Sequence, residues 1–229
     1  MTLSELQRET EYSFDQVLRW PTKRSKDWTL TFVSSASRNS NIIAIVAIGS
    51  AVRPNVSSTD IDLLALCTGL NSLNEAPPIE VDLRTYSLDG IEEKLGSGHD
   101  LLTWSIKFGR VLYQQNNFWD KLVNSWRFRL PLPSAKRARE RAATVYRHLT
   151  EILKLGDEYA AREQAISYLT HLVRADLLEK GVYPASRPEL TGQMREVGGS
   201  ELAEGLEQLL LTESMDLTQL NSLLKSLER

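Results

Sequence analysis

The sequence is poor in features that would mark several classes of protein. It contains a single cysteine, Cys67, so no disulfide can form within the chain and no cysteine-based metal site is expected. The longest apolar run, Ile42 to Ile48, is too short to cross a bilayer. The first residues, Met1 to Glu5, lack the basic and apolar segments of a signal peptide. We therefore expect a cytoplasmic protein with no membrane association.

The chain also lacks an excess of positive charge. Its formal net charge is −3 over 229 residues, which gives no global attraction to a polynucleotide backbone. A polynucleotide partner is therefore less expected than a small anionic substrate, which needs only local positive charge. Hydrophobic residues make up 41% of the chain and charged residues 25%, as in ordinary globular proteins.

The first half of the chain carries the patterns of β-strands. Two β-branched runs, 42–48 and 61–66, predict strands that are buried on both faces. The alternating segment 79–86 predicts a half-exposed strand, and 110–113 predicts a short edge strand. Amphipathic spacing predicts helices around these strands, at 3–20, 26–37, 88–95 and 100–108.

The second half of the chain shows no strand pattern. Six amphipathic segments predict helices at 118–128, 134–155, 159–180, 187–197, 201–211 and 217–227. Pro131 and Pro133 mark the boundary between the two halves. We therefore predict an α+β fold: a small mixed β-sheet domain flanked by helices at 1–130, followed by an all-α helical bundle at 134–229. The basic run 136–141 is interpreted as a solvated helix face; the alternative is that it lines a cleft facing the site and meets phosphates or an acidic partner.

A glycine–serine pair follows the first predicted strand. Gly49 lets the backbone turn and lets a phosphate approach closely, because it has no Cβ. Ser50 offers a hydroxyl and a backbone N–H at the start of a short helix, where an anion is favoured. Arg53, in the loop that follows, is a candidate phosphate ligand. The segment therefore predicts a phosphate-binding turn.

Three aspartates are predicted to converge near this turn. We expect Asp60 and Asp62 to lie on one face of the second strand, because they are two residues apart. Asp82, in the next strand, can bring a third carboxylate to the same edge, although Glu80 lies on the same strand face and competes for this role. Carboxylates gathered on one face repel unless a cation joins them, and Mg²⁺ prefers oxygen ligands. Two bound Mg²⁺ ions would activate an attacking oxygen and stabilise a leaving pyrophosphate.

This arrangement resembles the DNA polymerase β-like nucleotidyltransferase superfamily, and within it the minimal and antibiotic (aminoglycoside) nucleotidyltransferases. The resemblance is carried by residues 42–86. It implies transfer of a nucleoside monophosphate from ATP or another NTP to a hydroxyl group, with Mg²⁺. By this match Gly49 and Ser50 would hold the triphosphate and Asp60 and Asp62 the metals. Asp82 would contribute a third carboxylate that orients the nucleophile or acts as its base.

The acceptor is left open by the sequence. A small molecule such as an aminoglycoside, or a hydroxyl of a protein side chain, is favoured over a polynucleotide. The alternative is an antitoxin-like or regulatory protein that keeps the nucleotidyltransferase fold and acts by binding a toxin-like partner protein.

Overall fold

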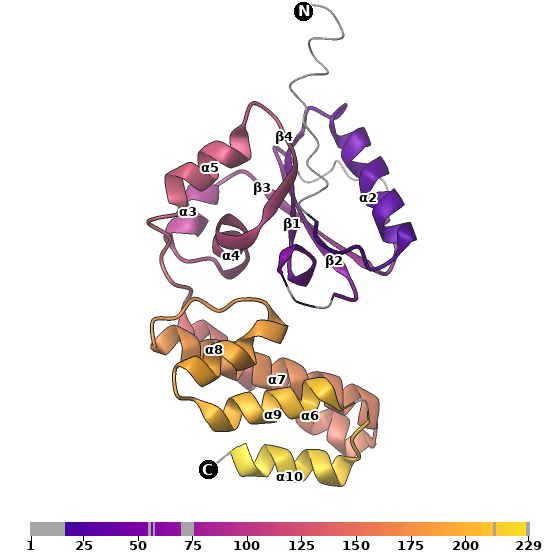
Figure 1. Ribbon diagram of the computed structural model, residues 1–229, viewed down its shortest axis with the longest axis vertical. Coiled ribbons are helices and arrows are strands. Elements are labelled where there is room, and N and C mark those ends of the chain that lie inside the picture. The colour runs from indigo at the N-terminus through magenta and orange to yellow at the C-terminus, as the bar shows by residue number, and fades with distance from the viewer. Residues whose placement is uncertain (1–16, 55, 57, 70–75, 213, 228–229) are drawn as a thin grey trace, which may run out of the picture. The chain divides into compact units, whose positions relative to one another are not determined.

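The computed structural model describes residues 17–54, 56, 58–69, 76–212 and 214–227. These residues form two compact units, one ending at Pro131 and the other beginning at Leu132 (Figure 1). The first unit contains a mixed β-sheet with flanking helices, and the second is helical, so the predicted α+β class is confirmed. Within the described ranges, no helix combines the length and the apolar character needed to cross a bilayer.

Four strands form the sheet of the first unit. They are β1 (Ile42–Ile48), β2 (Ile61–Cys67), β3 (Val81–Ser87) and β4 (Arg110–Gln114), arranged in the order β3-β2-β1-β4. β1 pairs antiparallel with β2 and β4, whereas β2 and β3 are parallel. The two apolar runs occupy the centre of the sheet, where nearly every side chain is buried, and the alternating segment lies at an edge.

Helices cover the two faces of this sheet. In Figure 1, α2 lies on one side of the strands and α3, α4 and α5 lie on the other. α2 begins with a capping box between Thr22 and Ser25, and it buries Phe32 and Val33. The helices of this unit are α2 (Lys23–Ala36), the 3₁₀ helix η2 (Ser50–Val52), α3 (Ile91–Gly96), α4 (Asp100–Phe108) and α5 (Phe118–Trp126).

The second unit packs most of its helices around a large apolar core. α6 and α7 form the central hairpin: Gly156 ends α6 in the left-handed conformation, and the Asp157 side chain caps α7. Leu149 and Leu169 from this hairpin and Leu206 from α9 are fully buried in the core. The helices are α6 (Ala135–Leu155), α7 (Glu158–Glu179), η3 (Arg187–Glu189), α8 (Leu190–Glu196), α9 (Ser200–Leu211) and α10 (Leu217–Leu227).

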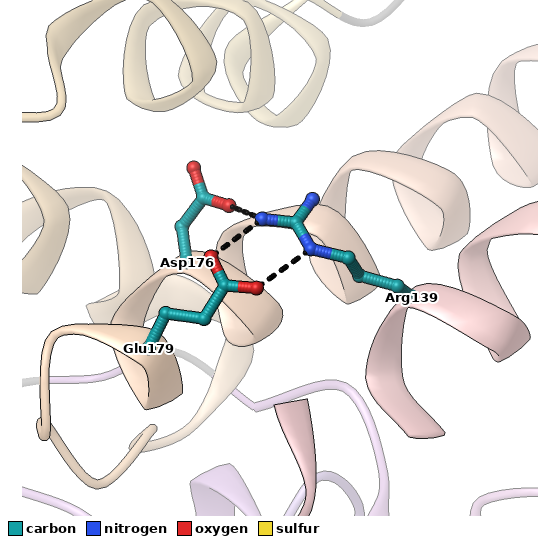
Figure 2. A network of polar contacts seen from close by, with 3 residues as sticks. All are labelled: Arg139, Asp176 and Glu179. Carbon is teal, nitrogen blue, oxygen red and sulfur yellow. Dashed lines mark hydrogen bonds and ion pairs between the residues drawn. The ribbon is translucent and has the colours of Figure 1, made fainter. Parts of the chain in front are cut away.

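A polar network joins α6 to α7 on the surface of the second unit (Figure 2). The Arg139 guanidinium donates from Nε and Nη2 to the two carboxylate oxygens of Glu179, at 2.8 and 2.7 Å. Nη2 also donates to Asp176 Oδ1 at 2.7 Å. Arg139 lowers the pKa of the Glu179 carboxyl, chiefly through these hydrogen bonds. The basic run on α6 is therefore not simply a solvated face, because one of its arginines ties the two helices together.

Several predicted elements differ from the structure in their bounds. The helix predicted at 88–95 begins only at Ile91, and the one predicted at 187–197 is divided into η3 and α8. The opening helix at 3–20 lies outside the described residues as far as residue 16, and residues 17–20 are not helical. The backbone N–H groups of Leu18 and Arg19 donate instead to the Ala51 carbonyl, so this segment runs beside the turn after β1. The third strand begins at Val81 rather than Ile79, because the N–H of Val81 closes a turn onto the Pro78 carbonyl.

Candidate functional site

Gly49 forms the turn at the end of β1 and lies directly against a carboxylate. Its backbone has φ 75° and ψ −158°, a combination that is almost restricted to glycine. A Cβ on this residue would lie 2.1 Å from Asp62 Oδ2 and 3.1 Å from Asp62 Cγ. The residue must therefore be glycine for two reasons, the backbone conformation and the close approach of Asp62.

Ser50 links the turn to the loop that leads to β2. Its hydroxyl donates to Ser58 Oγ at 2.9 Å, and the Ser58 hydroxyl donates to the backbone carbonyl of Asp60 at 2.5 Å. The two ends of the loop are thereby held together by hydroxyl groups. In this arrangement Ser50 fixes the backbone beside Asp60, in addition to any role toward a ligand.

Arg53 follows η2 and lies on an aromatic ring. Its guanidinium carbon is 4.4 Å from the centroid of the Phe108 ring, at the end of α4. The Arg53 guanidinium thus lies against Phe108 of α4, and its role as a phosphate ligand stays a prediction.

The two aspartates of the second predicted strand lie in different settings. Asp62 is the second residue of β2 and is largely buried, whereas Asp60 is exposed in the bend before the strand. The prediction that Asp60 lies in the strand is therefore wrong, although its charge still acts on Asp62. The strand ladder starts at Ile61, whose N–H donates to the carbonyl of Glu80.

Asp82 is the second residue of β3 and stands opposite Asp62 in the parallel ladder. Paired residues in neighbouring strands project from the same face of a sheet, so the two carboxyl groups share one face. Glu80 lies in the turn before β3, and its Oε2 is buried without a hydrogen-bond partner among the described residues. The carboxyl group that meets Asp62 is thus that of Asp82.

Burial and neighbouring carboxylates change the acidity of Asp62. They raise its pKa from 3.8 to about 7, with burial the largest cause, followed by the charges of Asp60 and Asp82. A hydrogen bond with the Asp82 carboxyl also raises this pKa, and the charge of Arg84 opposes these effects. The negative charge around Asp62 is therefore only partly compensated by the protein itself.

Arg84 supplies the compensating charge, a role for which it was not predicted. Its Nε and Nη2 donate to Oδ2 of Asp82 at 3.0 and 2.6 Å. The hydrogen bond to Asp82 is the largest cause of the raised pKa of the guanidinium. The signal was present in the sequence, because Asp82 and Arg84 are two residues apart in a strand and share a face.

The donor atoms at this edge of the sheet fit a hard divalent cation. Asp60, Asp62 and Asp82 offer only carboxylate oxygens, which Mg²⁺ prefers. The raised pKa of Asp62 indicates negative charge that a cation would offset. Throughout the described part of the chain, however, no group of three or more His, Cys, Asp or Glu side chains is arranged to hold a metal ion. One of the three carboxylates, that of Asp82, is turned to Arg84 instead.

Comparisons with known proteins add little to this picture. No protein-family model matches the chain, and no curated protein sequence is significantly similar to it. The structure is similar to the crystal structure of a nucleotidyltransferase-like protein from Exiguobacterium sibiricum 255-15, with 21% sequence identity and a TM-score of 0.41. The alignment covers 89% of this chain and 73% of the other. A likeness at this level says nothing about activity.

Proposed function

We propose that this chain is a Mg²⁺-dependent nucleotidyltransferase, which moves a nucleoside monophosphate from an NTP to a hydroxyl group. One observation carries the proposal. The carboxyl group of Asp62 lies against the backbone of Gly49 and opposite Asp82, so a glycine turn and a pair of acids meet at one edge of the sheet. A phosphate at the turn and a cation on the acids would then be neighbours, as nucleotidyl transfer requires.

The proposed reaction is an in-line displacement at the α-phosphorus. The acceptor oxygen forms a bond to phosphorus, the bond from phosphorus to the α,β-bridging oxygen breaks, and pyrophosphate leaves with that oxygen. The proton of the acceptor hydroxyl passes to a carboxylate, for which Asp82 is the proposed base. Backbone N–H groups at Gly49 and Ser50 would bind the triphosphate, with Arg53 as a further phosphate ligand. Mg²⁺ held by Asp60, Asp62 and Asp82 would offset the charge of the phosphates.

The proposed donor is ATP, and the proposed acceptor is a small molecule or a protein side-chain hydroxyl. The net charge of −3 supports this over a polynucleotide acceptor.

The test is a transfer assay with each of the four labelled NTPs, Mg²⁺ and a panel of acceptors. We expect Asp62→Asn to abolish transfer and Asp60→Asn to reduce it strongly, because each removes a charged metal ligand. The matched control is Asp27→Asn, which removes the same charge from an exposed position on α2. Transfer that persists in an Asp60→Asn, Asp62→Asn double variant would contradict the mechanism.

A second candidate function is that of a regulatory or antitoxin-like protein, which keeps the fold and binds a partner protein without nucleotide chemistry. The salt bridge between Arg84 and Asp82 bears on it only because it offsets the charge of Asp82 without a cation. An acid that is already neutralised by an arginine needs no metal. This candidate predicts that the wild-type chain binds none of the four NTPs in calorimetric titrations with Mg²⁺. Binding of any of them at micromolar concentration would count against it.

A further inference from the structure

Two cationic side chains lie over one aromatic ring, that of Phe108 at the end of α4. The guanidinium carbon of Arg53 is 4.4 Å from the ring centroid, and Lys107 Nζ is 5.6 Å from it. The two charges therefore lie within about 10 Å of each other, the sum of these distances. Arg53 comes from the loop after η2 and Lys107 from α4, so the ring gathers cations from two segments that are far apart in the sequence.

This pair of cations belongs to the same end of the sheet as the Gly49 turn. The backbone N–H of Arg53 donates to the Ser50 carbonyl, so Arg53 directly follows the turn. The strand that follows α4 is β4, and its first residue, Arg110, pairs with Ala47 of β1. The end of α4 is thus level with the end of β1 that leads into the turn.

Contact with an aromatic ring leaves the hydrogen-bonding capacity of an arginine in place. A stacked guanidinium meets the ring by its flat face, and its N–H donors lie along its edges. A lysine ammonium is a compact charge with three donors, and both groups bind phosphate oxygens. The ring attracts each cation but carries no net charge, so it does not neutralise them. Since Lys107 is exposed and Arg53 is half-buried, a soluble anion can reach the pair.

We propose that Arg53 and Lys107 bind the terminal phosphates of a polyphosphate chain, with Phe108 as the positioning residue that holds both cations beside the Gly49 turn. The inference rests on the proposed function, which places the triphosphate of an NTP at this turn. A chain with several negative charges interacts with both cations, whereas a nucleoside monophosphate has no terminal phosphates to offer. The pair would thus favour NTPs over nucleoside monophosphates, and it would hold the pyrophosphate as it leaves.

The test is calorimetric titration of the full-length chain with inorganic tripolyphosphate, ATP and AMP in a buffer that contains Mg²⁺. We expect Lys107→Gln to weaken the binding of tripolyphosphate and ATP about fivefold to tenfold, because a charged phosphate ligand is lost. The affinity for AMP should be unchanged. Lys107→Arg keeps the charge and should keep most of the affinity. The loss in Lys107→Gln should shrink at high salt, since water and ions reach the pair.

The role of the ring is tested by Phe108→Leu and Phe108→Tyr. Leucine removes the ring and should weaken tripolyphosphate binding about twofold to threefold, whereas tyrosine keeps a ring and should retain the wild-type affinity. The matched control is Lys26→Gln, which removes an exposed lysine from α2, on the side of the sheet opposite to α4 (Figure 1). Its affinity for tripolyphosphate should equal that of the wild type.

The possible outcomes separate this inference from the proposed function. Equal tripolyphosphate affinity of Lys107→Gln and the wild type would overturn the inference and leave the proposed function intact, as would an equal loss of affinity for AMP. Weaker tripolyphosphate binding by Lys107→Gln, together with no nucleotide transfer by the wild type, would support the anion site and count against the proposed function. A wild-type chain that binds neither tripolyphosphate nor ATP at millimolar concentration would refute both.

Discussion

Replacing Asp62 by asparagine should stabilise the first unit at neutral pH when no divalent cation is present. Burial and the charges of Asp60 and Asp82 raise the pKa of Asp62 from 3.8 to about 7. When the pKa of a carboxyl group is higher in the folded than in the unfolded protein, ionisation of that group destabilises the fold. The destabilisation is therefore small near pH 4, grows as the pH rises toward 7 and is complete above it. Asparagine has a similar shape and carries no charge at any of these values.

The size of the effect follows from the shift. A shift of one pKa unit corresponds to about 1.4 kcal/mol, so the shift of Asp62 corresponds to a penalty of at most about 4 kcal/mol at pH 8. At pH 5 the same shift gives about 1.7 kcal/mol, because most of the ionisation in the folded state has not yet occurred. Coupling to Asp60 and Asp82 spreads the titration over several groups. We therefore expect the advantage of Asp62→Asn over the wild type to grow by about 2 kcal/mol between pH 5 and pH 8.

The assay is urea unfolding in EDTA at several pH values, followed by tryptophan fluorescence. The five tryptophans of the chain, at positions 20, 28, 104, 119 and 126, all belong to the first unit, so the signal reports on the unit that contains Asp62. Asp27→Asn controls for the loss of one exposed carboxylate. A stability difference between Asp62→Asn and the wild type that stays constant from pH 5 to pH 8, or that reverses sign, would refute the reasoning.

Three further changes test the packing around the site and the helical unit. Gly49→Ala should destabilise the first unit by about 2–4 kcal/mol in the same fluorescence assay, because of the positive φ and the contact with Asp62, and a loss below about 0.5 kcal/mol would contradict the geometry. Ser58→Ala should cost about 1 kcal/mol, since it removes two hydrogen bonds of the loop before Asp60, and Thr59→Ala serves as its neighbouring control. Arg139→Gln should lower the stability of the helical unit by about 1 kcal/mol or less, measured by circular dichroism, and the loss should shrink in high salt.

The strands at the centre of the sheet could be predicted from the sequence because both of their faces are buried, which calls for apolar residues at nearly every position. The runs at 42–48 and 61–66 are apolar at almost every position, which suits a strand covered on both faces, and the structure contains β1 and β2 there. α4 also has the predicted bounds, Asp100 to Phe108, and it ends at Gly109. In these elements local pattern and tertiary environment favour the same structure.

The site itself could be predicted only in part, because its geometry depends on strand pairing. The spacing of Asp60 and Asp62 suggested a shared face, but the ladder begins between them and leaves Asp60 in a bend. The N–H groups of Leu18 and Arg19 donate to the Ala51 carbonyl in the turn after β1, a tertiary contact that apolar spacing cannot reveal. Strand periodicity places Arg84 on the same face as Asp82. It does not show that the arginine pairs with this acid rather than facing water, and the structure supplies that contact.

The positions of the two paired aspartates in the sheet suggest different roles for them. Asp62 lies in a central strand, close to Gly49, so its carboxyl group has few alternative positions and little access to water. Asp82 lies in the edge strand, is about half exposed and forms a salt bridge with Arg84. A fixed ligand contributes most when it is pre-organised, whereas a group that must accept a proton or release a cation needs freedom to move. The parallel register of β2 and β3 brings these two groups together, and a slip of one residue would turn Asp82 to the opposite face. The chemistry proposed for this edge of the sheet thus depends on strand register as much as on the acids themselves.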